Sequence, residues 1–167
     1  KLITVTDRFI AASSGAGVSD WVSLYGESDQ RHNRTPWFGG APWQQNAPID
    51  NYAAQSILKD AWRVKTPTLF FNGGRDVRVP PTQQIMMYRG VRSAGTPTRL
   101  YIAEGEPHNF RKPLNELFKI NTELAWFAHY SSAAKYVPVF PLAIDDKGAK
   151  DKQPTEKVQV EVDPKGQ

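Results

Sequence analysis

The chain has 167 residues, of which 40% are apolar and 23% are charged, a composition typical of one soluble globular domain. Its net charge is only +4, and its lysines and arginines are scattered, so the sequence indicates no nucleic-acid-binding surface. The absence of cysteine excludes disulfides and thiolate catalysis. The sequence contains no run of eighteen apolar residues, so it predicts no membrane-spanning helix.

The first residues predict the end of a helix followed by a strand. Residues 1–8 are expected to be helical, and Phe9–Ser13 reads as a strand that ends at Gly15-Ala16-Gly17. Ser13 lies in Ala11-Ala12-Ser13-Ser14-Gly15, a variant of the turn that carries nucleophilic serines, so it is an alternative nucleophile. Such a serine needs a helix directly after it, whereas a glycine-rich segment follows Ser13. A small packed serine is therefore the favoured interpretation.

Residues 18–50 are expected to form a long irregular connection that carries several aromatic side chains: Trp21, Tyr25, Trp37, Phe38 and Trp43. Aromatic residues this dense in a loop usually cover a core, and the alternative is an apolar wall of a substrate pocket. His32 has no companion ligands at metal spacing, so neither a metal site nor a cofactor site is predicted. A helix over Asp50–Asp60, capped by Asp50, is expected next.

A buried strand and an acidic turn come in the middle of the chain. Leu69-Phe70-Phe71 is a short apolar run of the kind found in strands covered on both faces. Gly73-Gly74 ends this strand and places Asp76 at its carboxyl end, where open α/β sheets hold their reactive groups. Pro80-Pro81 then begins a helix that runs over Thr82–Ala94 and is closed by Gly95.

A second unit repeats this arrangement. Arg99–Ile102 reads as a strand, and the loop Ala103–Asn109 after it carries His108. A helix is expected over Asn115–Tyr130, where apolar residues recur at helical spacing: Leu117, Ile120, Leu124, Phe127 and Ala128. Asp76 and His108 thus fall on neighbouring strand ends, as the orienting acid and the base of a Ser-His-Asp triad do, in the chain order used by α/β-hydrolases.

Several motifs together resemble one known family. They are Thr6–Phe9, Gly15–Trp21, Trp37–Gly40 with Pro42-Trp43, Ser56-Ile57, Asp76–Pro80 with Gln83, Gly95–Thr98 and Glu104–Phe110. In this order they resemble the C-terminal catalytic domain of the prolyl oligopeptidase family, especially its acylaminoacyl-peptidase and dipeptidyl-peptidase-like branches. The resemblance covers residues 1–130 and implies the C-terminal half of an α/β-hydrolase fold, with Asp76 and His108 acting on a peptide substrate.

The same resemblance implies that the nucleophile lies outside the chain. In the family pattern, Lys1 would follow the nucleophilic serine by about eight residues, within the helix after it. We therefore expect the lone chain to be nearly inert as a hydrolase. A complementary N-terminal polypeptide carrying the serine, or a second copy of the chain, is the expected partner. The alternatives are a catalytically inert half-domain that self-associates and an esterase that uses Ser13.

Residues 131–167 lie beyond the resemblance and are expected to form an extended tail. Asp145–Pro154 is polar and charged, as linkers are, and Lys157–Val162 alternates as a strand does. The tail is thus expected to be a linker and a C-terminal strand whose affiliation the sequence leaves open.

Overall fold

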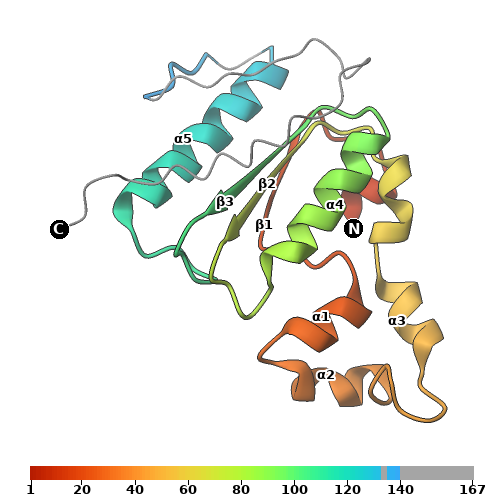
Figure 1. Ribbon diagram of the computed structural model, residues 1–167. Coiled ribbons are helices and arrows are strands. Elements are labelled where there is room, and N and C mark those ends of the chain that lie inside the picture. The colour runs from red at the N-terminus through yellow and green to blue at the C-terminus, as the bar shows by residue number, and fades with distance from the viewer. Residues whose placement is uncertain (133–134, 140–167) are drawn as a thin grey trace.

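A three-stranded parallel sheet forms the centre of the protein, whose computed structural model describes residues 1–132 and 135–139. Its strand order is β1 (Ala12–Gly15), β2 (Thr68–Gly73) and β3 (Thr98–Ala103). All six residues of β2 are buried, as expected of a central strand covered on both faces (Figure 1). The predicted α/β class is confirmed, and the strand predicted over residues 9–13 begins and ends two to three residues later.

The sheet lies between two long helices (Figure 1). On one side, Phe70 packs with Met87 and Val91 of α4 (Pro81–Ser93). On the other, Leu69 and Phe71 pack with Trp126 of α5 (Pro113–Tyr130). Successive side chains of β2 therefore pack on opposite faces of the sheet, because side chains alternate sides along a strand. Gly95 has a φ of 82° just after α4, so its predicted role in closing that helix is confirmed.

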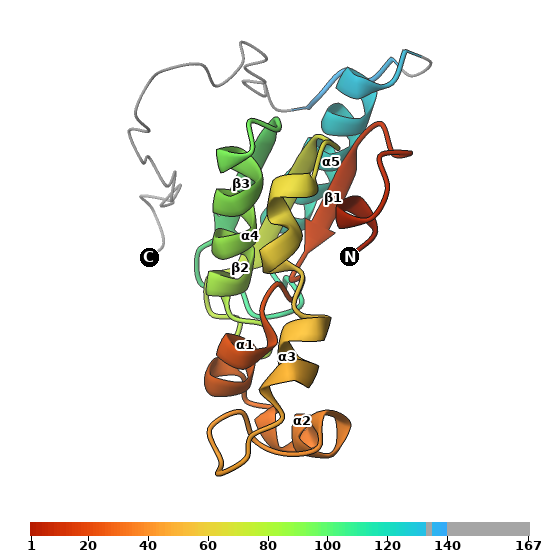
Figure 2. The same ribbon diagram turned by 90° about the vertical axis from the view of Figure 1, so that its right-hand side faces the viewer.

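A small helical lobe lies at one end of the sheet (Figures 1 and 2). It contains α1 (Trp21–Glu27), α2 (Arg31–Phe38) and α3 (Ile49–Gln55). The prediction of an irregular connection over 18–50 is therefore wrong for much of its length. The Asp20 carboxylate accepts the Ser23 N–H and caps α1, and Gly39, with a φ of 84°, ends α2.

The aromatic residues of this lobe pack on one another. Tyr25, Phe38 and Tyr52 form its buried cluster, against which Trp21 packs, and the Phe38 and Tyr52 rings stack with 4.1 Å between centroids. Trp37 and Trp43 remain 70% and 61% exposed, so only some of the aromatic residues of the 18–50 segment cover a core.

The helix predicted over Asp50–Asp60 is shorter than expected. It ends at Gln55, and the 3₁₀ helix η2 (Leu58–Arg63) follows it. Asp50 lies in the first turn of α3, whose N-cap is Pro48, so the predicted cap is also wrong. The interruption follows from Ser19, whose carbonyl accepts the N–H groups of Ile57 and Leu58 and draws the chain away from helical geometry.

The apolar stripe of α5 faces outward. Four of its side chains, which we call the α5 apolar face, are 38–53% exposed: Leu117, Ile120, Leu124 and Phe127. The buried side of α5 consists instead of Asn121, Thr122, Ala125 and Trp126. The helix α5 was predicted correctly, but its periodicity did not identify which stripe covers the sheet.

Within the described residues β1 pairs only with β2, so its other edge is unpaired.

Residues 135–139 lie against α5. The Tyr136 hydroxyl donates to Asn121 Oδ1 over 2.9 Å, and the Val139 N–H donates to the same oxygen over 2.6 Å. The predicted linker over Asp145–Pro154 and the predicted strand over Lys157–Val162 lie outside the described residues. Among the described residues, no helix combines the length and apolar character that crossing a bilayer requires.

Candidate active site

Asp76 lies in the turn between β2 and α4 and is 2% exposed. Its Oδ1 atom accepts the backbone N–H groups of Arg78 and Val79 over 2.8 and 2.9 Å. These two bonds fix the carboxylate in the turn, as Asx turns do. Its second oxygen, Oδ2, is thereby directed toward the next loop.

His108 meets Asp76 from the loop after β3. Its Nδ1 atom lies 2.8 Å from Asp76 Oδ2, and its side chain is 40% exposed. An ionised carboxylate can only accept hydrogen bonds, so the proton of a neutral His108 ring belongs on Nδ1. The Nε2 atom then keeps its lone pair and can accept a proton from another group. The structure thus brings the two sequence-predicted residues into direct contact.

Close backbone contact holds the two loops together. The Arg75 N–H donates to the Glu106 carbonyl over 2.9 Å. A Cβ atom added at Gly73 would lie 2.3 Å from the Pro107 carbonyl oxygen and 2.4 Å from that of Glu106. Only glycine permits this approach of the end of β2 to the loop that carries His108.

Arg78 links the turn of Asp76 to the helical lobe. Its Nε and Nη2 atoms donate to the two carboxylate oxygens of Asp29 over 2.7 and 3.2 Å. The Asp29 N–H also donates to the Val77 carbonyl over 3.0 Å. This bidentate contact ties the turn that holds Asp76 to the helical lobe. The hydrogen bond from the guanidinium lowers the pKa of the Asp29 carboxyl below its ordinary value.

Sequence reasoning did not find Glu106, which is 1% exposed. Burial raises its pKa, but hydrogen bonds from the Arg111 N–H, the Asn115 side chain and the Lys112 N–H outweigh burial, and the pKa lies below its ordinary value. The available signal was an acidic residue a few positions before the predicted helix, where backbone N–H groups lack partners.

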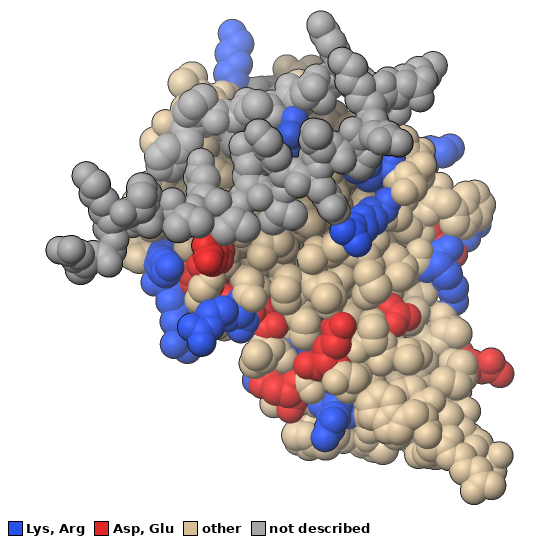
Figure 3. Space-filling view, in the orientation of Figure 1, with Lys and Arg blue, Asp and Glu red and all other residues tan. Residues whose placement is uncertain are grey.

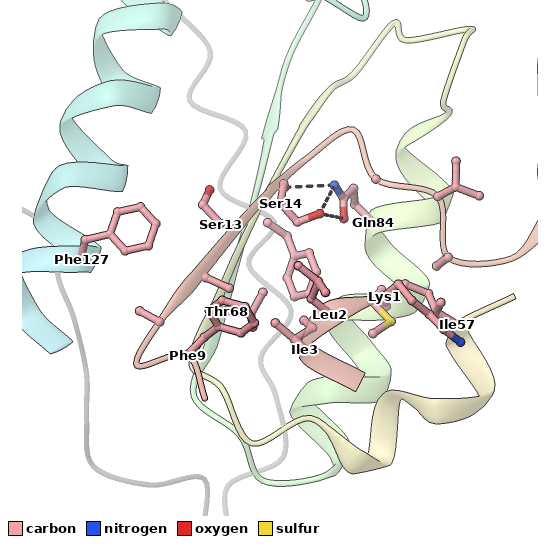
Figure 4. A pocket seen from close by; sticks show the side chains of 17 residues that line it. Lys1, Leu2, Ile3, Phe9, Ser13, Ser14, Ile57, Thr68, Gln84 and Phe127 are labelled. Carbon is pink, nitrogen blue, oxygen red and sulfur yellow. Dashed lines mark hydrogen bonds between the residues drawn. The ribbon is translucent and has the colours of Figure 1, made fainter. Parts of the chain in front are cut away.

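Ser13, the alternative nucleophile, lies in β1 and is held by a carboxylate. Its hydroxyl donates to Glu123 Oε1 of α5 over 2.7 Å, and Lys119 pairs with the same carboxylate over 2.8 Å. In Figure 4, Ser13 points toward α5, whereas Ser14 points toward Gln84 on the other side of the sheet. The next helix begins only at Trp21, so Ser13 lacks the strand-to-helix turn of such nucleophiles.

An open hollow of about 530 Å³ lies along β1 and is lined mainly by apolar side chains (Figure 4). Phe9, Phe70, Met87 and Phe127 contribute to its walls, together with the N-terminal residues.

Basic side chains are spread over the face seen in Figure 3 rather than gathered in one patch. Within the described residues, no cluster of histidine and acidic side chains could hold a metal ion.

Comparison with known proteins gives consistent matches. The family model described as prolyl oligopeptidase family matches residues 2–134. A curated relative from Porphyromonas endodontalis, dipeptidyl-peptidase 5, is 30% identical over 122 residues, which cover 71% of this chain and 17% of the relative. The uncharacterized peptidase YuxL of Bacillus subtilis is 28% identical over 129 residues, covering 75% and 19%.

Solved structures agree with these matches. A puromycin-hydrolyzing peptidase of Mycobacterium tuberculosis superposes with a TM-score of 0.68 at 28% identity, covering 78% of this chain and 20% of that one. Pyrococcus horikoshii acylaminoacyl peptidase superposes with a TM-score of 0.67 at 26% identity, covering 83% and 22%. The chain therefore spans about a fifth of the length of these proteins.

Proposed function

Because the chain belongs to the prolyl oligopeptidase family and has the α/β-hydrolase fold, we propose that it supplies the acid and the base of a Ser-His-Asp triad. The reaction is hydrolysis of peptide or acyl-peptide bonds. The observation that carries this proposal is the 2.8 Å contact between Asp76 Oδ2 and His108 Nδ1 at the carboxyl ends of two adjacent parallel strands.

In this reaction His108 moves the proton and Asp76 supports it. A serine hydroxyl attacks the acyl carbon while His108 Nε2 accepts its proton, and His108 then gives that proton to the leaving amine. Water hydrolyses the acyl-enzyme in a second step with His108 again as the base. Asp76, fixed by two backbone N–H groups, keeps the proton of the neutral ring on Nδ1 and stabilises the imidazolium that forms.

The serine, we propose, comes from outside these 167 residues. No serine in the sequence lies in a Gly-x-Ser-x-Gly pattern. Within residues 1–132 and 135–139, no serine hydroxyl is hydrogen-bonded to His108. We propose that a complementary N-terminal polypeptide carries the serine and the groups that stabilise the oxyanion. The length of the relatives supports this proposal, because this chain covers only 17–20% of them.

Two exposed features support a docking surface for that polypeptide. Among residues 1–132 and 135–139, no strand pairs with the edge of β1 that faces away from β2, so this edge offers backbone groups to a further parallel strand. The α5 apolar face lies beside β1, because Ser13 of β1 bonds to Glu123 of α5 and Phe127 lines the hollow along the strand. Burying this face would remove apolar side chains from water, which drives association.

The docking surface is tested with Ile120→Lys. Ile120 is 53% exposed at the centre of the α5 apolar face, and a lysine there would have to be buried on association. We expect the affinity for the serine-bearing polypeptide to fall roughly 10- to 100-fold, the cost of losing one buried aliphatic side chain. Calorimetry measures the affinity, and hydrolysis of an acylated amino-acid anilide by the mixture measures the activity.

Ile49→Lys is the matched control, because Ile49 is a 44% exposed isoleucine in α3 of the helical lobe. It should leave both affinity and hydrolysis unchanged. If Ile120→Lys behaves like this control, the proposed surface is wrong. If the wild-type chain forms only homo-oligomers and never gains activity, the alternative of a self-associating half-domain is favoured.

A further inference from the structure

Glu106 is a buried carboxylate that the proposed triad does not use. Its Oε2 atom accepts the Arg111 N–H over 2.7 Å, and its Oε1 atom accepts the Lys112 N–H over 3.1 Å and the Asn115 side chain over 2.6 Å. All three donors lie at or just before the beginning of α5. Three donors on a carboxylate that is only 1% exposed hold it in a defined geometry, because a buried charge is costly unless it is hydrogen-bonded.

These bonds close the segment that carries His108 into a ring. The bond from the Arg111 N–H to Glu106 spans residues 106–111, with His108 between its ends. In the part of the chain that the structure describes, the N–H groups of His108, Asn109 and Phe110 donate no hydrogen bond, and Pro107 has none to donate. The side chain of Glu106 therefore supplies the hydrogen bond that joins the two ends of this segment.

The backbone of Glu106 is fixed from the opposite direction. Its carbonyl accepts the N–H of Arg75, the residue directly before Asp76, and Gly73 packs closely against the same carbonyl. Glu106 thus connects the turn of Asp76 through its main chain to the first turn of α5 through its side chain. His108 lies two residues after this connection.

We propose that Glu106 is a positioning residue for His108: its carboxylate holds the 106–111 segment so that Nδ1 stays on Asp76 Oδ2. This inference rests on the proposed function, in which that contact selects the active tautomer. The alternative is that Glu106 only stabilises the beginning of α5. These two roles predict different tautomers of the His108 ring in a variant that changes the Glu106 carboxylate but keeps the fold.

The test is long-range ¹H–¹⁵N correlation spectroscopy on the full 167-residue chain, which reports which ring nitrogen carries the proton. The His108 signals are assigned by their loss in His108→Gln. In the wild type we expect a proton on Nδ1 only. In Glu106→Gln, an amide N–H group replaces one carboxylate oxygen and faces a backbone N–H that it cannot accept. We expect the His108 ring to lose its single Nδ1-protonated tautomer. The protection of the β2 and β3 amides against hydrogen exchange should stay unchanged, which shows that the fold is kept.

Glu104→Gln is the matched control, because it makes the same charge change two residues earlier at an exposed position. It should retain the wild-type pattern. A wild-type pattern in Glu106→Gln would overturn the inference and leave the proposed function standing. A wild-type ring without the Nδ1 proton would instead overturn the Asp76–His108 pairing and the inference together.

A second variant keeps the inference testable if Glu106→Gln does not fold. Asn115→Ala leaves the carboxylate in place and removes one of its three donors. We expect it to show both ring tautomers, and a single Nδ1 tautomer would overturn the inference. In the enzyme formed with the serine-bearing polypeptide, displacing the base by about 1 Å should lower kcat by about 10²-fold with little change in KM.

Discussion

Asp76→Asn should lower kcat about 10⁴-fold in the enzyme that this chain forms with the serine-bearing polypeptide. The asparagine oxygen can still accept the N–H groups of Arg78 and Val79, so the turn is kept. Its amide nitrogen then faces His108 Nδ1 as a donor, which moves the proton of the ring to Nε2 and removes the base. Steady-state kinetics with an acyl-peptide anilide measures the loss.

Asp29→Asn is the control for this change. Asp29 is an exposed carboxylate that pairs with Arg78 and does not contact His108. Its substitution should leave kcat within severalfold of the wild type, because exposed ion pairs contribute little. If Asp76→Asn keeps kcat within tenfold of the wild type, Asp76 is not the orienting acid.

Gly73→Ala is expected to have the largest effect on stability. The added Cβ would lie 2.3 and 2.4 Å from two backbone carbonyl oxygens, which cannot rotate away as a side chain could. The end of β2 and the His108 loop must then separate, which costs about 1–3 kcal/mol, as overpacking in a filled core does. The midpoint of urea denaturation measures this cost.

The control is Gly15→Ala, at the corresponding carboxyl end of β1. A Cβ there would meet only Lys119 Cε at 3.8 Å, an ordinary contact. Its effect on the free energy of unfolding should be within about 0.5 kcal/mol, so the midpoint should stay close to that of the wild type. Equal midpoints for the two variants would contradict the close packing of the loops, and hence the fixed placement of His108.

The parts of the fold that the sequence predicted are those set by local pattern. Leu69-Phe70-Phe71 between turn signals predicts β2, because a short apolar run fits a strand covered on both faces. Parallel strands end at the same edge of a sheet, so the positions of Asp76 and His108 after two successive strands were sufficient to predict their proximity.

The parts that were missed depend on tertiary contacts. The burial of Asn121 and Thr122 in place of Leu117 and Ile120 depends on what covers each side of α5, which periodicity does not encode. Glu106 was missed for a similar reason, because its three donors converge only when the 106–115 segment folds back on itself.

The most direct measurement is the intact mass of the purified sample before and after reaction with a fluorophosphonate probe, with all polypeptides resolved. We expect a second polypeptide to take the probe and this chain to remain unlabelled. We also expect labelling of that polypeptide to fall when Asp76→Asn is introduced here. An adduct on the 167-residue chain itself that disappears in Ser13→Ala would contradict an external serine and make Ser13 the nucleophile.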